Sequence, residues 1–139
     1  MLSTVQNKVT TFTCEKLLVK VYPDTDKMGA AAAEEVSVKL RELLQVKEEV
    51  NMIFAAAPSQ SAFLKSLTED KRIDFTRINA FHMDEYVGLE STHPQSFGRF
   101  LDRSVFSLAP FKSVHYINGA AVSKEEECRR YSDLLERYP

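Results

Sequence analysis

The stretch Asn51-Met52-Ile53-Phe54-Ala55-Ala56-Ala57 is apolar at every position after its first residue, and Pro58 ends it. Such a run predicts a β-strand that is buried on both faces, as strands inside a parallel sheet are. The residues that follow, Ser59-Gln60-Ser61, open a predicted helix that continues through Leu67. A buried strand followed at once by a helix is the repeating unit of α/β folds.

The same alternation precedes this unit. Residues 17–22 are apolar and partly β-branched, and Pro23 follows them, which predicts an earlier strand. Asp24 or Asp26 then caps a predicted helix. The side chains expected to form the buried stripe of that helix recur every four residues: Met28, Ala32, Val36, Leu40 and Leu44.

The alternation also continues downstream. Residues 78–83 predict another strand, and His93-Pro94 predicts the start of a helix, because proline suits the first helical position. Residues 114–118 predict a further strand, and Ser123 with Glu126 forms a capping-box pattern for a final helix. We therefore expect a single α/β domain over residues 1–139, an open parallel sheet with helices on both faces in a Rossmann-like three-layer arrangement.

Composition narrows the classes of function. The 139 residues include 18 basic and 20 acidic side chains, a net charge of −2, which argues against nucleic acid as a partner. No apolar run approaches the roughly 20 residues of a membrane span, and residues 1–8 lack the apolar core of a signal peptide. We expect a cytoplasmic protein with no membrane partner. Cys14 and Cys128 lie outside any metal-binding or CxxC pattern and are expected to be reduced thiols.

Two segments lie where open α/β sheets bind ligands, outside the carboxyl ends of strands. The first is Pro58-Ser59-Gln60-Ser61, between a predicted strand and its helix. Free backbone amides and the helix dipole make such a turn receptive to phosphate, and the hydroxyls of Ser59 and Ser61 add donors. In the alternative interpretation, Ser59 only caps the helix.

The second segment is His82-Met83-Asp84-Glu85-Tyr86, at the end of the strand predicted over residues 78–83. Adjacent side chains point in different directions, so the two acids cannot both face one ligand atom. One acid is therefore expected to be catalytic and the other structural. A carboxylate at this place can act as a general base toward a sugar carbon. The alternative is a solvated acidic turn that caps the next helix.

The string Met83-Asp84-Glu85-Tyr86-Val87-Gly88-Leu89, followed by His93-Pro94-Gln95-Ser96-Phe97, resembles the signature of glucosamine-6-phosphate deaminases (isomerases). The resemblance extends from about Glu15 to Pro139. It implies the conversion of glucosamine 6-phosphate and water to fructose 6-phosphate and ammonia. No metal and no organic cofactor are implied.

The resemblance also implies roles for individual residues. Asp84 corresponds to the base that moves a proton between C2 and C1 of the sugar, and Glu85 tunes or positions it. The turn of Pro58, Ser59, Gln60 and Ser61 corresponds to part of the phosphate and sugar pocket. His82 is the histidine nearest to the base and is a further candidate for contact with the substrate.

Two departures from the family pattern limit these implications. Family members usually carry a glycine-rich turn of the type PTGGTP where this chain has residues 58–63, which leaves the substrate open. Members also continue into a loop with Asp-Gly-His and then a Glu, which serve ring opening. A chain of 139 residues is therefore expected to be the N-terminal part of a longer enzyme and inactive alone. Its sheet would have an open edge, which predicts self-association into a homo-oligomer.

Two other functions compete with the deaminase. A 6-phosphogluconolactonase shares the fold, but such enzymes tend to have Asp-Glu-Arg where this chain has Asp84-Glu85-Tyr86, so Tyr86 favours the deaminase. A non-catalytic sugar-phosphate-binding module is the third possibility, because the turn at Pro58 is altered. A small sugar phosphate is the expected ligand in all three cases.

Overall fold

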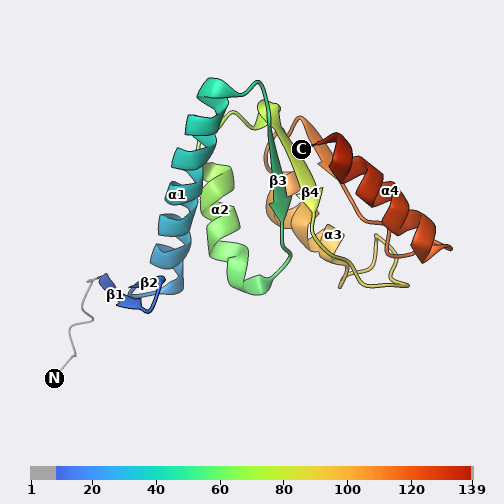
Figure 1. The fold of residues 1–139 in the computed structure, drawn as a ribbon. Helices are drawn as coiled ribbons and strands as arrows, with labels where there is room; N and C mark the ends of the chain where they lie inside the picture. Colours follow the sequence, from blue (N-terminus) through green and yellow to red (C-terminus); the bar gives the residue numbers. More distant parts are fainter. Residues whose placement is uncertain (1–8, 139) are drawn as a thin grey trace.

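The computed structural model describes residues 9–138 (Figure 1). Its strands are β1 (Thr10–Cys14), β2 (Leu17–Val21), β3 (Val50–Phe54), β4 (Ile78–His82) and β5 (Ser113–His115). Its α-helices are α1 (Thr25–Val46), α2 (Ser61–Glu69), α3 (Phe97–Leu101) and α4 (Lys124–Arg137). Short turns lie between them: the 3-10 turns η1 (Pro58–Gln60) and η2 (Phe75–Arg77), and the π-helical turn η3 (Asp102–Phe106).

Strands β3, β4 and β5 form a parallel sheet with β4 in the middle. Phe54 of β3 pairs with His82 of β4, and Phe81 pairs with His115 of β5. Parallel neighbours need long crossover connections, and the segments that contain α2 and α3 supply them. The predicted open parallel α/β sheet is confirmed. Because the strands run in the same direction, the carboxyl ends of β3 and β4 lie at the same end of the sheet.

One face of this sheet carries the main core. Alternate side chains of β3 and β4 point to this face and are buried, among them Phe54, Ile78 and Ala80. They pack with α1, α2, α3 and η3, and Leu64 and Leu67 of α2 are fully buried there, as the sequence predicts. Burying one such leucine contributes about 1.5–3 kcal/mol. This packed layer therefore holds in place the sheet whose strand β4 leads into Asp84 and Glu85.

Helix α4 covers the opposite face (Figure 1). The ring of Phe81 stacks on His115 at 4.8 Å between centroids, and the ring of Tyr138 meets Phe81 edge-on at 5.3 Å. Helices on both faces are therefore confirmed. The prediction that residues 51–57 are buried on both faces is wrong for Ile53, which is 51% exposed. Helix α4 packs against β4 and β5 and not against β3, so Ile53 on that face of β3 is left exposed to solvent.

The buried stripe of α1 differs from the prediction in its first half. Met28 is 44% exposed, and the buried residues are Gly29, Ala33, Ser37, Leu40 and Leu44. The reason is the close crossing of α1 and α2: a Cβ at Gly29 would lie 2.6 Å from the carbonyl carbon of Ala62. Small residues, rather than large apolar ones, allow this approach. Of the two candidate caps, Asp24 is the N-cap, and its Oδ1 accepts a hydrogen bond from Lys27 N at 2.8 Å.

The strand predicted over residues 17–22 exists, but it does not join the parallel sheet. As β2 it pairs antiparallel with β1 in a separate two-stranded hairpin. Its turn holds Glu15 at a positive φ of 52°. The sequence does not predict β1, because three of the five residues in Thr10–Cys14 are threonines and the segment is not continuously apolar. The hairpin leaves Leu17 and Leu18 largely exposed.

The helix predicted to start at His93-Pro94 starts later. Helix α3 begins at Phe97, and Ser96 is its N-cap, with Ser96 Oγ accepting from Arg99 N at 3.3 Å. Pro94 lies in the preceding turn. The last predicted helix is confirmed as α4, where Ser123 Oγ accepts from Glu126 N at 3.2 Å.

Within residues 9–138, Cys14 and Cys128 are free and exposed. No helix in this range has the length and apolar character that crossing a bilayer requires.

Candidate active site

The two segments singled out in the sequence meet at the carboxyl ends of β3 and β4. The first is the Pro58 turn, residues 58–61, and the second is the acidic loop, residues 84–89. A pocket of about 330 Å³ lies between them, and Pro58 and Tyr86 both line it. The start of α3 closes it with the rings of Phe97 and Phe100. The structure therefore brings the two predicted segments to one place.

Asp84 and Glu85 have different environments. The Asp84 side chain is exposed at the end of the central strand β4 and forms no hydrogen bond or ion pair with another residue of the range 9–138. Its carboxylate is therefore available to a ligand.

Glu85 is bound to the start of α3. Its Oε2 accepts hydrogen bonds from Ser96 Oγ at 2.6 Å and Gly98 N at 2.9 Å. Its Oε1 accepts from Phe97 N at 3.0 Å and from Tyr86 N at 2.9 Å. These donors include amides that the first turn of a helix leaves without partners, and the helix dipole favours the negative charge. Glu85 therefore serves as a cap for α3, and the alternative of an acidic turn that caps the next helix holds for this residue.

The pKa of Glu85 reflects these contacts. Burial alone would raise the pKa of its carboxyl group, but the hydrogen bonds from Ser96, Gly98, Tyr86 and Phe97 outweigh burial and hold the pKa below its ordinary value. Glu85 is thus ionised at neutral pH and is fully engaged. This geometry favours a positioning role for Glu85 over direct proton transfer.

His82 lies behind the site. Its side chain is fully buried at the end of β4, and its Nδ1 accepts a weak hydrogen bond from Ile117 N at 3.4 Å. Its Nε2 has no partner within residues 9–138. Burial lowers the pKa of His82, although the charges of Glu85 and Asp84 act in the opposite direction. A fully buried ring offers a substrate no surface, so we propose that His82 supports the strand end and does not contact the ligand.

The Pro58 turn differs from the simple picture of free amides around a phosphate. Gln60 N donates to Ala57 O at 2.9 Å, and Ser61 N donates to Pro58 O, so two amides are used inside the turn. Ser59 is not the N-cap of α2: Ala57 precedes η1, Gln60 precedes α2, and neither side chain caps. The hydroxyls of Ser59 and Ser61 have no hydrogen-bond partner within residues 9–138. These hydroxyls, together with the amide of Ser59, are therefore donors that the turn can offer.

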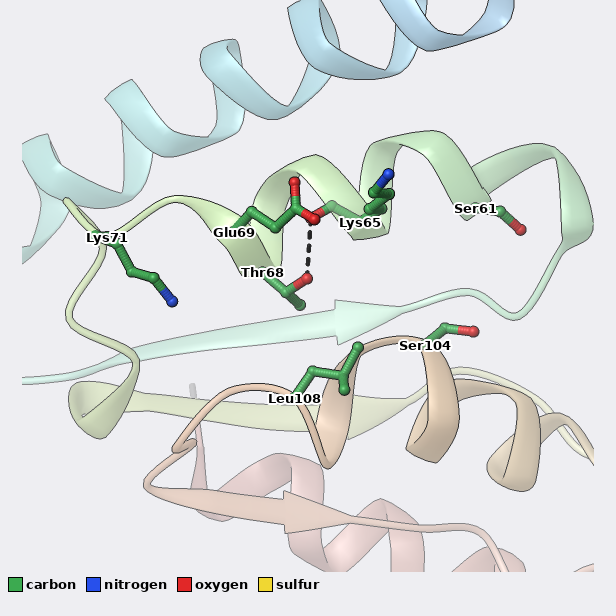
Figure 2. A pocket seen from close by; sticks show the side chains of 7 residues that line it. All are labelled: Ser61, Lys65, Thr68, Glu69, Lys71, Ser104 and Leu108. Carbon is green, nitrogen blue, oxygen red and sulfur yellow. Dashed lines mark hydrogen bonds between the residues drawn. The ribbon is translucent and has the colours of Figure 1, made fainter.

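A larger hollow, about 440 Å³, lies away from the acidic loop (Figure 2). It runs between α2 and η3 and is lined by Ser61, Lys65, Thr68, Glu69, Lys71, Ser104 and Leu108. The Thr68 hydroxyl is bonded to the carbonyls of Leu64 and Lys65, at 3.0 Å each. Of the predicted site residues, Ser61 alone lines this hollow, so the Pro58 turn divides between two pockets.

The structure adds residues that the sequence reading did not assign to the site. Ser96 and Gly98 bind Glu85, and a Cβ at Gly98 would lie 3.4 Å from both Glu85 Oε2 and His82 Cε1. Gly119 approaches the acidic loop and accepts a hydrogen bond from Gly88 N at 2.7 Å. The chain has four glycines in total, and their scarcity is the available signal that they mark special backbone positions, such as the close approach at Gly119 and the positive φ of 84° at Gly88. No cluster of three or more potential metal ligands forms within residues 9–138.

Sequence comparisons identify similar proteins. The family described as glucosamine-6-phosphate isomerases/6-phosphogluconolactonase matches residues 23–139. A glucosamine-6-phosphate deaminase of Thermoanaerobacter sp. (strain X514) is 36% identical over 113 residues, which cover 75% of this chain and 45% of that protein. A deaminase of Streptococcus sanguinis (strain SK36) is 38% identical over 85 residues, 61% of this chain and 36% of that protein. The chain spans less than half the length of these curated relatives.

Solved structures share the fold. A monomeric glucosamine-6-phosphate deaminase has a TM-score of 0.71 at 23% identity, over 82% of this chain and 48% of that one. A 6-phosphogluconolactonase from Thermotoga maritima has a TM-score of 0.72 at 23% identity, over 80% of this chain and 50% of that one. Likeness at this identity shows the fold alone and does not separate the two activities. With the acidic loop at the end of a central parallel strand and the family match over residues 23–139, the chain belongs to the glucosamine-6-phosphate isomerase/6-phosphogluconolactonase family.

Proposed function

We propose that this chain binds glucosamine 6-phosphate and carries Asp84 as the base that converts it toward fructose 6-phosphate and ammonia. The observation that carries the proposal is the division of roles between the two adjacent acids. Three hydrogen bonds from the start of α3 hold Glu85 as a cap, and a fourth comes from Tyr86 N, while the Asp84 carboxylate is exposed beside it at the end of β4. A rigid cap next to an available carboxylate is the arrangement that a positioned base needs.

The proposed proton transfer acts on the open-chain sugar. Asp84 removes the proton from C2, the electron pair forms the C1–C2 double bond, and the carbonyl oxygen at C1 takes up a proton. The proton on Asp84 then returns to C1, and the nitrogen at C2 becomes an imine. Water adds to that imine, its oxygen remains as the ketone of fructose 6-phosphate, and ammonia leaves. In this scheme the base is regenerated.

The Pro58 turn is the proposed contact for the phosphate end. The free hydroxyl of Ser59 stands in the turn just before α2, where the helix dipole favours an anion, whereas Ser61 lines the larger hollow. Because the amides of Gln60 and Ser61 are used within the turn, the hydroxyl and the amide of Ser59 are the donors proposed for this contact. The altered turn is thus compatible with a sugar phosphate, with a different set of donors.

A thermal-shift titration of the purified chain tests the proposal. Glucosamine 6-phosphate, fructose 6-phosphate and 6-phosphogluconate are compared as ligands. Stabilisation follows RT ln(1 + [L]/Kd), so a ligand at 100 times its Kd should contribute about 2.7 kcal/mol. We expect the first two ligands to stabilise the chain and the Ser59→Ala variant to bind them more weakly. Ser132→Ala, which removes an exposed hydroxyl on α4, is the matched control.

Each outcome has a defined meaning. If none of the three ligands stabilises the wild-type chain, the proposal is wrong. Stabilisation by 6-phosphogluconate alone would favour the lactonase, whose fold this chain also shares. Binding of glucosamine 6-phosphate without any proton exchange at the sugar carbons would instead fit a non-catalytic sugar-phosphate-binding module.

A further inference from the structure

The acidic loop rests on a turn from a distant part of the chain, residues 118–121, here called the support turn. Gly88 N donates to Gly119 O at 2.7 Å. A Cβ at Gly119 would lie 2.3 Å from Tyr86 O and 2.9 Å from Glu85 Cγ. Such distances leave no room for a side chain, and backbone of the acidic loop is among the atoms in the way. The support turn therefore lies directly against the loop that carries Asp84.

Helix α4 holds the support turn through one carboxylate. Asn118 N donates to Glu127 Oε1 at 2.7 Å, and Arg130 Nε donates to Glu127 Oε2 at 2.7 Å. Arg130 also reaches the end of β5, where its Nη2 donates to Tyr116 O at 2.8 Å. The hydrogen bond from Arg130 is the largest of the effects that lower the pKa of Glu127. The Glu127 carboxylate is thus ionised and ties α4 to the turn.

This contact differs from an ordinary ion pair on a helix surface. Exposed pairs three residues apart on a helix contribute little. The Glu127 side chain, however, is only 11% exposed, and one of its oxygens is bonded to a backbone amide outside the helix. Loss of its charge would therefore release the support turn, not merely a surface pair.

We propose that Glu127 and Gly119 are positioning residues that fix the acidic loop, and with it Asp84, from the opposite face of the sheet. The path runs from α4 through Asn118 to Gly119, and from Gly119 to Gly88. The proposal deepens the function proposed above and rests on it for the link to Asp84. The contact between turn and loop can be tested without that function.

Amide hydrogen exchange followed by NMR tests the contact directly. In Glu127→Gln, we expect the Gly88 amide to exchange about tenfold faster than in the wild-type chain, because a charge-assisted hydrogen bond of the support turn is lost. The Phe81 amide in the central strand should change less than about twofold. Glu125→Gln is the matched control, since Glu125 is an exposed acid in the first turn of the same helix.

The affinity for glucosamine 6-phosphate links the contact to the site. We expect the affinity for glucosamine 6-phosphate to fall about fivefold in Glu127→Gln and to stay unchanged in Glu125→Gln. Gly119→Ala, which forces the turn away from Tyr86 O, should act in the same direction as Glu127→Gln. If Glu127→Gln does not fold, Arg130→Gln is the second variant, because it leaves the carboxylate in place but removes its partner.

Two results would overturn the proposal. The first is an equal rise in exchange at Gly88 and Phe81, which would mean that Glu127 only stabilises the whole fold. The second is unchanged exchange at Gly88 in a folded Glu127→Gln variant. If the wild-type chain binds no glucosamine 6-phosphate, the proposed function fails, and the exchange data alone still decide whether the support turn fixes the loop.

Discussion

At the scale of single residues, the site depends on three neighbours with three different environments. His82 is buried, Glu85 is half-buried and bound on both oxygens, and Asp84 is exposed. The sequence predicted that one acid is catalytic and the other structural, because adjacent side chains diverge. It offered a helix-capping acidic turn as an alternative but could not show that Glu85 is the capping acid, since the amides of Phe97 and Gly98 lie 12 and 13 residues away and only the fold brings them close.

The cap predicts a stability change at Glu85. Glu85→Gln should lower the free energy of unfolding by about 1–3 kcal/mol, because an amide cannot satisfy all the donors that the carboxylate binds. Urea denaturation at pH 7 measures this change. Glu90→Gln, an exposed acid just past the acidic loop, should stay within about 0.5 kcal/mol of the wild-type chain. An equal effect in both variants would contradict the role of Glu85 as a cap.

The same cap predicts a dependence on pH. The pKa of Glu85 in the folded chain is held below its ordinary value of 4.5. Its contribution is therefore complete above pH 4.5 and is lost as the pH falls through the lower folded value. The difference in stability between the wild-type chain and Glu85→Gln should shrink over that window.

His82 predicts a second pH effect, at higher pH. Burial lowers its pKa below the ordinary 6.5, so the folded chain resists a proton that the unfolded chain accepts. Stability should therefore be highest above pH 6.5 and fall as the pH drops toward the folded value. In His82→Gln the fall in the urea midpoint between pH 7 and 5.5 should be smaller. It should not vanish, because burial also lowers the pKa of His115. The same fall in both chains would rule out this role for His82.

At the scale of elements, the strands and helices near the sheet were predictable from local pattern, whereas contacts between elements were not. Helix α2 and strand β4 matched their predicted positions because their apolar patterns are strong. The start of α3 was misplaced at Pro94 because the side chains of Ser96 and Glu85 set it. The stripe of α1 was misread because its partner at Gly29 is the backbone of α2.

The close crossing of α1 and α2 predicts the effect of one added methyl group. Gly29→Ala should lower the free energy of unfolding by about 1–3 kcal/mol through overpacking, although alanine is the better helix former. The reason is that the new Cβ meets the backbone of Ala62, which cannot rotate away. Ala30→Ser adds one atom on the exposed side of the same helix and should have little effect. A Gly29→Ala variant as stable as the wild-type chain would contradict this packing.

At the scale of the whole molecule, the described sheet has two open edges and one partly uncovered face. Strands β3 and β5 each pair with β4 alone within residues 9–138, and Ile53 is 51% exposed beside them. The sequence predicted the parallel sheet, since buried runs alternate with helices. It misassigned β2, because a hairpin strand and a sheet strand have the same local pattern.

Because the sheet has two unpaired edge strands within the described residues, we predict that the chain self-associates. We expect light scattering to show an average mass that rises with concentration, because unpaired strand edges join readily. Ile53→Lys, which places a charge beside the edge of β3, should reduce the effect, while Val46→Lys, on an exposed position at the end of α1, should not. A monodisperse monomer at high concentration would count against association.

The central claim is that Asp84 transfers a proton at the sugar carbons. The most direct measurement is NMR of fructose 6-phosphate incubated with the chain and an ammonium salt in D₂O. Ammonia forms the imine at C2, and ring opening is not required because some of the sugar is already open-chain. We expect the wild-type chain to introduce deuterium at C1, and Asp84→Asn not to do so. Asp133→Asn, which changes an exposed acid on α4, is the control and should behave like the wild-type chain. Deuterium incorporation by Asp84→Asn at the wild-type rate would contradict the role of Asp84 as the base. The absence of deuterium incorporation by the wild-type chain would also contradict that role.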